Sequence, residues 1–215
     1  MSPVPSRRCS RCQRPQPRCL CPLIPSLEQA CPILILQHAS EARHALNTAR
    51  LAHLGLQDTE LWVGECFDAL PARLAQARQA VLLFPGEGAV PAGQPVGAHP
   101  DGGPPERGPP DRGPPDLIVV PDGTWRKARR ILTANPLLLE LPRWVLPAGA
   151  PSRYRLRKAP DPQAVSTLEA IVRVLQILEP QRDFTPLLRP FEQLIAEQIQ
   201  AMGPDTYRRN YPTST

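Results

Sequence analysis

Short apolar runs alternate with helical apolar repeats along this chain. The runs have the length and composition of buried strands, and they lie at residues 33–36, 59–63, 81–84, 117–120 and 144–146. Apolar positions recur at helical spacing in other segments, at residues 41–54, 71–78, 126–134, 166–178 and 187–202. Strands that alternate with helices are typical of a largely parallel sheet, so the pattern predicts an α/β fold.

The stretch 117–125 joins a predicted strand to a predicted helix through a sharp turn. Pro121 and Gly123 are expected to end the strand, and a basic helix is expected to begin at Arg126. Open α/β sheets bind their ligands at the carboxyl ends of the strands. The turn would therefore present a carboxylate, a hydroxyl and an indole at a binding edge, from Asp122, Thr124 and Trp125.

A structural explanation of the same turn is also open. Asp122 would then cap the helix by accepting hydrogen bonds from its first N–H groups. Trp125 would be an ordinary core aromatic. Other parts of the sequence have to decide between the two interpretations.

A second glycine-rich corner follows the third predicted strand at the same edge of the sheet. It consists of Pro85, Gly86, Glu87 and Gly88, and its glycines would allow the backbone to approach a ligand closely. An ordinary turn uses the same residues. The corner is therefore a second candidate for the binding edge.

Polar residues at the ends of other predicted elements have simpler explanations. Ser166, with Glu169 three residues later, predicts a capping box at a helix start. His38 follows the first strand and is expected to be a hydrogen-bonded structural residue, with a ligand role as the alternative. Off the apolar face of the next helix, the candidates for a functional face are Asn47, Thr48 and Arg50.

Four cysteines lie close together near the N-terminus, in the spacing Cys9-x2-Cys12-x6-Cys19-x-Cys21. Four thiolates at such short spacing can close a tetrahedral zinc site, and a segment this small could not keep its shape by hydrophobic burial. We therefore predict a zinc knuckle within residues 1–30, followed by a domain over residues 31–215. The other two cysteines, Cys31 and Cys66, are expected to be buried as small apolar groups.

Proline is concentrated in one segment of the chain. The sequence contains 30 prolines among its 215 residues, a share far above the usual one of about 5%. A Gly-Pro-Pro repeat begins at Gly103, Gly108 and Gly113. Its period of five excludes a collagen helix, which needs glycine at every third position. Residues 89–115 are therefore predicted to be a disordered or polyproline-like insertion outside the core.

Positive charge is also concentrated. The formal net charge is +5, and residues 1–22 carry +5 and residues 117–158 carry +7, so the rest of the chain is acidic. Two basic segments suit a nucleic-acid phosphate backbone, although solvated surface charge is the alternative. In the first segment five arginines interleave with the cysteines. In the second the candidate RNA contacts are Arg126, Lys127, Arg153, Tyr154, Arg155, Arg157 and Lys158.

The N-terminus lacks the apolar core of a signal peptide, and no apolar run approaches the roughly 20 residues of a membrane span. The sequence therefore predicts a cytoplasmic protein with no membrane partner. In that reducing compartment, cysteines are expected to bind a metal or to be buried rather than to form disulfides.

Taken together, these motifs resemble one protein family. They are the four-cysteine head, Gln37-His38-x2-Glu41, Asn47-Thr48-Ala49-Arg50, Leu83-Phe84-Pro85-Gly86-Glu87, Asp122-Gly123-Thr124-Trp125, Tyr154-Arg155-Leu156-Arg157-Lys158 and Ser166-Thr167-Leu168-Glu169. In this order they are similar to the DTW-domain family, and most of all to its bacterial tRNA-uridine aminocarboxypropyltransferase branch. The similarity spans nearly the whole chain apart from the proline-rich insertion.

The resemblance implies a SPOUT-like α/β domain, a class that includes trefoil-knotted cofactor sites. It also implies a reaction, in which the 3-amino-3-carboxypropyl group of S-adenosylmethionine (SAM) moves to a uridine ring nitrogen of tRNA and methylthioadenosine leaves. By the same resemblance, catalysis falls to Asp122, Thr124 and Trp125. The implied cofactor contacts are Phe84, Pro85, Gly86, Glu87, Val120, Pro121, Asp122, Gly123, Ser166 and Thr167.

Asp122 is the one carboxylate of the central turn. A carboxylate is a weak base for a uridine imide, so we expect it mainly to orient the base or the donor's ammonium, with partial base character. Two other functions remain open. One is a SPOUT-type RNA methyltransferase that uses the same cofactor, and the other is a non-catalytic zinc-knuckle RNA-binding protein.

Overall fold

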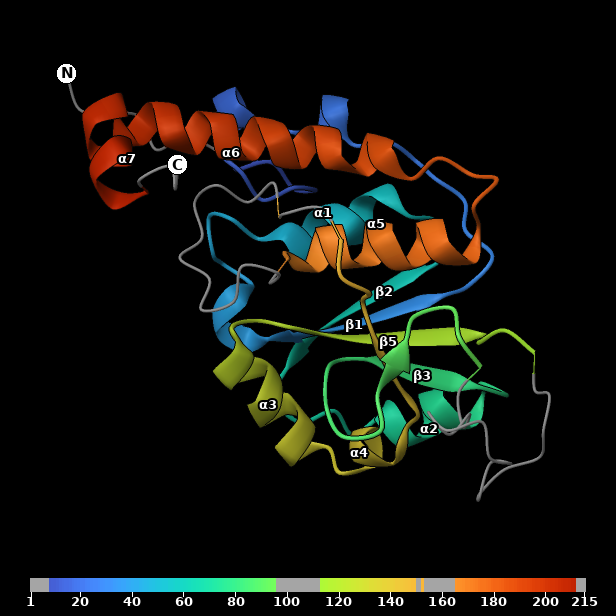
Figure 1. The fold of residues 1–215 in the computed structure, drawn as a ribbon. Coiled ribbons are helices and arrows are strands. Elements are labelled where there is room, and N and C mark those ends of the chain that lie inside the picture. Colours follow the sequence, from blue (N-terminus) through green and yellow to red (C-terminus); the bar gives the residue numbers. More distant parts are fainter. Residues whose placement is uncertain (1–7, 96–112, 150–151, 153–164, 212–215) are drawn as a thin grey trace.

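The computed structural model describes residues 8–95, 113–149, 152 and 165–211, which form an α/β fold (Figure 1). Six strands make one sheet in the order β2-β1-β5-β3-β6-β4, and every neighbouring pair is parallel. The strands are β1 Ile33–His38, β2 Thr59–Gly64, β3 Ala80–Leu83, β4 Val90–Pro91, β5 Leu117–Asp122 and β6 Arg143–Val145. The predicted parallel α/β architecture is confirmed.

Helices cover both faces of the sheet, and α6 lies over α1 and α5 as a further layer (Figure 1). The α-helices are α1 Thr48–Gly55, α2 Leu70–Ala75, α3 Trp125–Ala134, α4 Leu137–Glu140, α5 Thr167–Leu178, α6 Leu188–Met202 and α7 Pro204–Asn210. The short 3-10 helices are η1 Gln16–Arg18, η2 Cys21–Leu23, η3 Ala39–Glu41 and η4 Thr185–Leu187. None of the helices in the described part of the chain is both long and apolar enough to span a membrane.

The central strands β1 and β5 are buried along their whole length, because each sends alternate side chains to two separate cores. On one face Ile35 and Val120 pack with residues of α1, α5 and α6. On the other face Leu36 and Val119 pack with residues of α2, α3 and α4. A strand covered on both faces needs apolar residues at consecutive positions, which is why the sequence shows runs there rather than alternation.

Strand β5 continues through Pro121 and Asp122, so the expectation that Pro121 ends the strand was wrong. On one side β1 still pairs there, with Leu36 opposite Pro121 and Gln37 opposite Asp122. On the other side β3 pairs with β5 only as far as Val119. The missing N–H of proline therefore removes no ladder hydrogen bond on the β3 side. The two extra residues bring the carboxylate of Asp122 level with β1.

Helix α1 begins later than predicted. The helical repeat suggested a start at residue 41, but the helix begins at Thr48, with Asn47 as its N-cap. The Asn47 side chain accepts a hydrogen bond from the backbone N–H of Arg50 at 3.0 Å, which is the usual way in which asparagine starts a helix. Residues 39–47 instead form η3 and a loop along the carboxyl edge of the sheet.

The prediction that residues 89–115 form an insertion outside the core was wrong at both ends of the segment. Val90 and Pro91 form β4, which pairs with β6, and Ala92 is buried in the core. Pro115 is also buried, at the other end. A strand of two residues leaves no periodic signal in a sequence. The middle of the segment, residues 96–112, lies outside the described residues.

The cysteines outside the N-terminal cluster differ from each other. Cys31 is buried, as predicted, and burial raises the pKa of its thiol to about 12. Cys66 is exposed, so the prediction that it is buried was wrong. It lies in the turn after β2, between an acid and an aromatic, where no apolar pattern indicated its environment.

The capping box at the start of α5 is confirmed. The Ser166 hydroxyl accepts a hydrogen bond from the Glu169 backbone N–H at 3.2 Å, and the Glu169 carboxylate accepts one from the Ser166 backbone N–H at 2.9 Å. Ser152 also donates its hydroxyl to the same carboxylate, at 2.7 Å. The Ser166 hydroxyl also lies 2.8 Å from that carboxylate and can donate to it. Glu169 is buried, and these three donors compensate for its lost hydration.

We expect Ser166→Ala to lower the free energy of unfolding by about 1 kcal/mol, the usual cost of losing an N-cap side chain. Ser166→Thr keeps a hydroxyl and should restore most of that loss. Chemical denaturation of both variants beside the unmodified protein measures the difference. Equal midpoints for Ser166→Ala and the unmodified protein would show that the cap contributes nothing.

Candidate functional site

A cavity of about 220 Å³ lies at the carboxyl ends of β3, β5 and β6, against the start of α5. Several residues predicted as cofactor or catalytic contacts line it together, although they come from three separate parts of the chain. They are Phe84, Pro85, Val120, Pro121, Gly123, Trp125 and Thr167. The volume is below the roughly 300–1,000 Å³ of common ligand pockets, so the cavity would enclose part of a SAM-sized ligand.

Aromatic rings form one wall of the cavity. The rings of Phe84 and Trp125 lie with centroids 5.4 Å apart and planes tilted by 60°. Trp144 adds a third ring, which is almost fully buried. Such a wall suits a planar heterocycle or an apolar thioether.

The start of α3 also borders the cavity. Thr124 is the N-cap residue but its side chain makes no capping hydrogen bond, and Trp125, the first helical residue, lines the cavity. The uncapped N–H groups of a helix start favour a negatively charged group nearby. This end of the cavity is therefore suited to a carboxylate.

Helix α5 runs along the cavity, and its side chains make the two ends of the cavity chemically different. Thr167, Ala170 and Arg173 recur at a spacing of three residues and all line it. At 1.5 Å per residue, Thr167 and Arg173 are about 9 Å apart along the helix axis. The cavity thus extends from the neighbourhood of Asp122, which Thr167 contacts, to the guanidinium of Arg173.

Asp122 is buried beside the cavity, between two donors from distant elements. One carboxylate oxygen accepts a hydrogen bond from Gln37 Nε2 at 2.7 Å, and the other accepts one from Thr167 Oγ1 at 2.5 Å. The N-cap residue of α3 is Thr124, whereas Asp122 is the last residue of β5. Gln37 is itself fully buried and exchanges hydrogen bonds with Asn47. The carboxylate therefore connects β1, β5 and the starts of α1 and α5.

Other predicted contacts lie away from the cavity walls. Ser166 uses its hydroxyl in the helix cap, and Thr124 and Glu87 are exposed. Gly86 is exposed too, but it packs under the Arg143 guanidinium, where a Cβ would clash. The guanidinium is the end of a flexible side chain that can move aside, so this contact alone does not require glycine at that corner.

Sequence reasoning missed a large part of the cavity wall. The residues concerned lie in or just after β6 and in or just before α5, and they include Trp144, Leu146, Pro147, Val165, Ala170 and Arg173. The carboxyl end of β6 was a foreseeable site once a parallel sheet was predicted. Arg173 could have been found by its spacing from Thr167, two helical steps of three residues.

His38 is a hydrogen-bonded structural residue, as predicted. Its Nδ1 lies 3.0 Å from Ser40 Oγ and its Nε2 lies 3.1 Å from Glu65 Oε2. Arg130 also binds Glu65, and this guanidinium lowers the pKa of the Glu65 carboxyl. Among the other candidates near β1, Thr48 is buried in the first turn of α1.

The predicted RNA contacts divide into three groups. Arg126 is exposed and has no ion pair with any residue that the structure describes. Lys127 donates its Nζ to Glu41 Oε1 at 2.6 Å, so its charge is already paired. The remaining candidates lie outside the described residues: Arg153, Tyr154, Arg155, Arg157 and Lys158.

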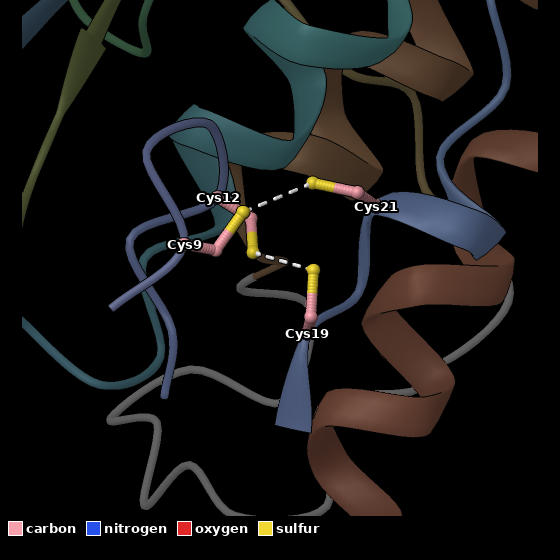
Figure 2. Close-up of side chains that lie close together, drawn as sticks. All are labelled: Cys9, Cys12, Cys19 and Cys21. Atoms are coloured by element: carbon pink, nitrogen blue, oxygen red, sulfur yellow. Dashed lines mark hydrogen bonds between the residues drawn. The ribbon is translucent and has the colours of Figure 1, made fainter. Parts of the chain in front are cut away.

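The four N-terminal cysteines converge on one point (Figure 2). Cys9 Sγ lies 3.6 Å from Cys21 Sγ, and Cys12 Sγ lies 3.8 Å from Cys19 Sγ. All four sulfurs are within 4.8 Å of one another and none is in a disulfide. A tetrahedral zinc with bonds of about 2.3 Å places its sulfurs about 3.8 Å apart. The cluster therefore fits a metal of this kind with little adjustment.

The protonation of the cysteines is uneven. Hydrogen bonds from the backbone N–H groups of Cys12 and Arg11 lower the pKa of Cys9 to about 6. Burial, together with the neighbouring thiols, raises the pKa of Cys21 to about 12. A metal that binds all four sulfurs as thiolates would release protons at neutral pH, because Cys21 is protonated without it.

The cysteine cluster is attached firmly to the rest of the protein. Leu20, between two of the cysteines, is buried in the main core, and η2 packs against α6. Arg14 donates to Glu197 of α6 at 2.6 Å and to the backbone carbonyl of Ala45 at 3.4 Å. Ala45 belongs to the loop after β1, so the cluster sits at the same edge of the sheet as the cavity.

Comparison with known proteins agrees with this geometry. The sequence model of the DTW domain matches residues 6–199. The chain is 31% identical to tRNA-uridine aminocarboxypropyltransferase 2 of Drosophila melanogaster, over 91% of this chain and 77% of that protein. The proteins of the same name from Macaca fascicularis and Mus musculus are 30% and 31% identical, each over 89% of this chain and 63% of the relative. No solved structure is significantly similar to the chain.

The chain therefore belongs to the DTW domain family. It spans a little under two thirds of the macaque and mouse relatives and about three quarters of the fly protein. The matched segment includes the cysteine cluster, the cavity and Asp122.

We expect Cys21→Ser to weaken zinc binding by more than 100-fold, since even residues that only orient a metal ligand are worth about 10- to 100-fold. The melting temperature should fall with it, because a structural metal contributes directly to folding. Chelator competition and thermal unfolding measure the two effects. Cys66→Ser is the matched control, because Cys66 is exposed and outside the cluster, and it should change neither.

Proposed function

We propose that this protein is a tRNA-uridine aminocarboxypropyltransferase. The main support is the cavity at the carboxyl edge of the sheet, which lies beside the buried Asp122 and is lined in part by the Asp-Gly-Thr-Trp turn. The chain that forms it belongs to the DTW domain family. Relatives from fly, macaque and mouse bear this activity in their names. The substrates are SAM and tRNA.

In the reaction, SAM supplies an electrophilic carbon whose bond to the sulfonium breaks. A uridine ring nitrogen forms a bond to that carbon and releases its proton to the solvent, and methylthioadenosine leaves as a neutral thioether. The leaving group is already activated, so the protein mainly has to align the carbon with the nitrogen. The walls of the cavity would provide this alignment.

The composition of the cavity walls fits SAM, the donor of the aminocarboxypropyl group. The aromatic wall of Phe84, Trp125 and Trp144 suits the adenine ring, and the uncapped start of α3 suits the carboxylate. The cofactor contacts remain those of the predicted corner, turn and helix start, to which we add Arg173. Ser166, Gly86 and Glu87 act as supports of this wall rather than as direct contacts.

Asp122 acts in this scheme by positioning. Both of its oxygens already accept hydrogen bonds, from Gln37 and Thr167, so its free capacity to take a proton is reduced. A carboxylate in that state orients a substrate donor group better than it serves as a base. Thr124 and Trp125 follow it directly and complete the predicted catalytic turn.

We propose further that the fold is SPOUT-like, that the metal is a structural zinc and that the protein is cytoplasmic. The parallel sheet with a ligand cavity at its carboxyl edge supports the first, and four convergent thiols support the second. A tRNA substrate and reduced cysteines both suit the cytoplasm.

Incubation of the purified protein with SAM and bulk tRNA tests the function directly. Aminocarboxypropyluridine in the digested tRNA, with an equal amount of methylthioadenosine, is the expected result. A methylated nucleoside with S-adenosylhomocysteine would assign a methyltransferase instead. RNA binding without any SAM product would assign a non-catalytic RNA-binding protein.

We expect Asp122→Asn to lower the transfer rate at least about 100-fold, because an amide places a donor opposite Gln37 or Thr167 and misaligns the site. Stability should fall by about 1–3 kcal/mol for the same reason. Asp116→Asn is a matched control, because Asp116 also accepts hydrogen bonds through both oxygens but lies at the amino end of β5. It should cost stability and leave transfer intact. Full transfer by Asp122→Asn would refute any role for this carboxylate.

A further inference from the structure

A continuous band of protein surface joins the cysteine cluster to α3. Arg14 connects the cluster to the loop after β1 through Ala45, and Lys127 of α3 binds Glu41 at the start of the same segment. Figure 1 shows this segment running along the edge of the sheet, from the side of α3 to the start of α1. The cluster, the loop and α3 are therefore held side by side.

Five arginines on this band make neither an ion pair nor a side-chain hydrogen bond within the described part of the chain. All five are exposed. They are Arg11 and Arg18 of the cysteine cluster, Arg43 of the loop, and Arg126 and Arg129 of α3.

The acids that touch the band are already neutralised. Glu197 is bound by Arg14, Glu41 by Lys127 and Glu65 by Arg130. The second ion pair keeps the loop against α3, and the first keeps the cluster against α6. The five exposed arginines therefore produce a net positive field, while the paired basic residues serve as structural links.

At the opposite edge of the sheet, two arginines are themselves paired with acids. Asp116 pairs with Arg78 at the amino end of β5, and Glu28 and Glu179 surround Arg182 nearby. A polyanion approaching such a molecule would be oriented with its phosphates toward the band and hence toward the cavity.

We propose that the arginines of the cysteine cluster, the loop after β1 and α3 form one docking surface for the phosphate backbone of tRNA. This docking surface rests on the proposed function. It adds a role for a metal bound by the cysteine cluster, which would hold part of the RNA-binding surface at a set distance from the cavity. Arg14 is a positioning residue in this arrangement, whereas Arg11 and Arg18 contact phosphate.

The test compares two double variants of the full-length, zinc-loaded protein. Arg11→Ala with Arg18→Ala should weaken tRNA binding, and the slope of log affinity against log salt should shrink by roughly 1 to 2, since each phosphate contact contributes about 0.7–0.9. Affinity for SAM should not change. The control, Arg78→Ala with Arg182→Ala, removes two exposed arginines of the opposite edge and should alter neither affinity nor slope.

Three outcomes would overturn the docking surface. One is an unchanged salt slope in the first variant, and another is an equal loss in the control. The third is a parallel loss of SAM affinity, which would mean that the cluster acts through the cavity. Binding of tRNA is measured without turnover, so failure of the aminocarboxypropyl assay alone would count against the proposed function and not against this surface.

Discussion

The carboxylate of Asp122 is buried between an amide of β1 and a hydroxyl of α5, and the arrangement of the candidate site depends on it. A buried carboxylate is costly unless its oxygens are hydrogen-bonded. Gln37 and Thr167 meet that requirement only if the ends of β1 and β5 are level and α5 starts directly above them. The same alignment fixes Pro121, Gly123 and Thr167 as neighbouring walls of one cavity.

The polar network extends outward from this carboxylate. Gln37 pairs with Asn47, which starts α1, and the loop before Asn47 receives Arg14 from the cysteine cluster. The cysteine cluster is thus linked to the edge of the site through a short series of hydrogen bonds. The parallel sheet makes this possible, because it gathers the ends of strands that are far apart in the sequence.

Charge is distributed in a way that matches this geometry. Paired basic residues such as Arg14 and Lys127 hold surface segments in place, and unpaired arginines stand between them. Arginine is suited to both tasks, since its planar guanidinium binds carboxylates and phosphates through two parallel hydrogen bonds. The high arginine content seen in the sequence thus has two separate explanations, one structural and one concerned with a polyanionic partner.

Local features of the sequence were sufficient for the strands, the α5 capping box and the cysteine cluster. Apolar runs fix buried strands, a serine with a glutamate three residues later satisfies a helix start, and close cysteine spacing limits where four sulfurs can meet. These depend on neighbours within a few residues or one short turn. The residues of the Asp-Gly-Thr-Trp turn were also identified as candidates before their surroundings were known.

Only the tertiary structure decided what those candidates do. Gln37 is 85 residues from Asp122 and Thr167 is 45 residues away, so no local pattern could assign Asp122 these two partners. The continuation of β5 through Pro121 depends on where β3 stops, and β4 exists only because β6 lies beside it. Arg173 faces the cavity because α5 packs along it. Each of these outcomes is set by contacts between distant segments, which form only when the sheet assembles.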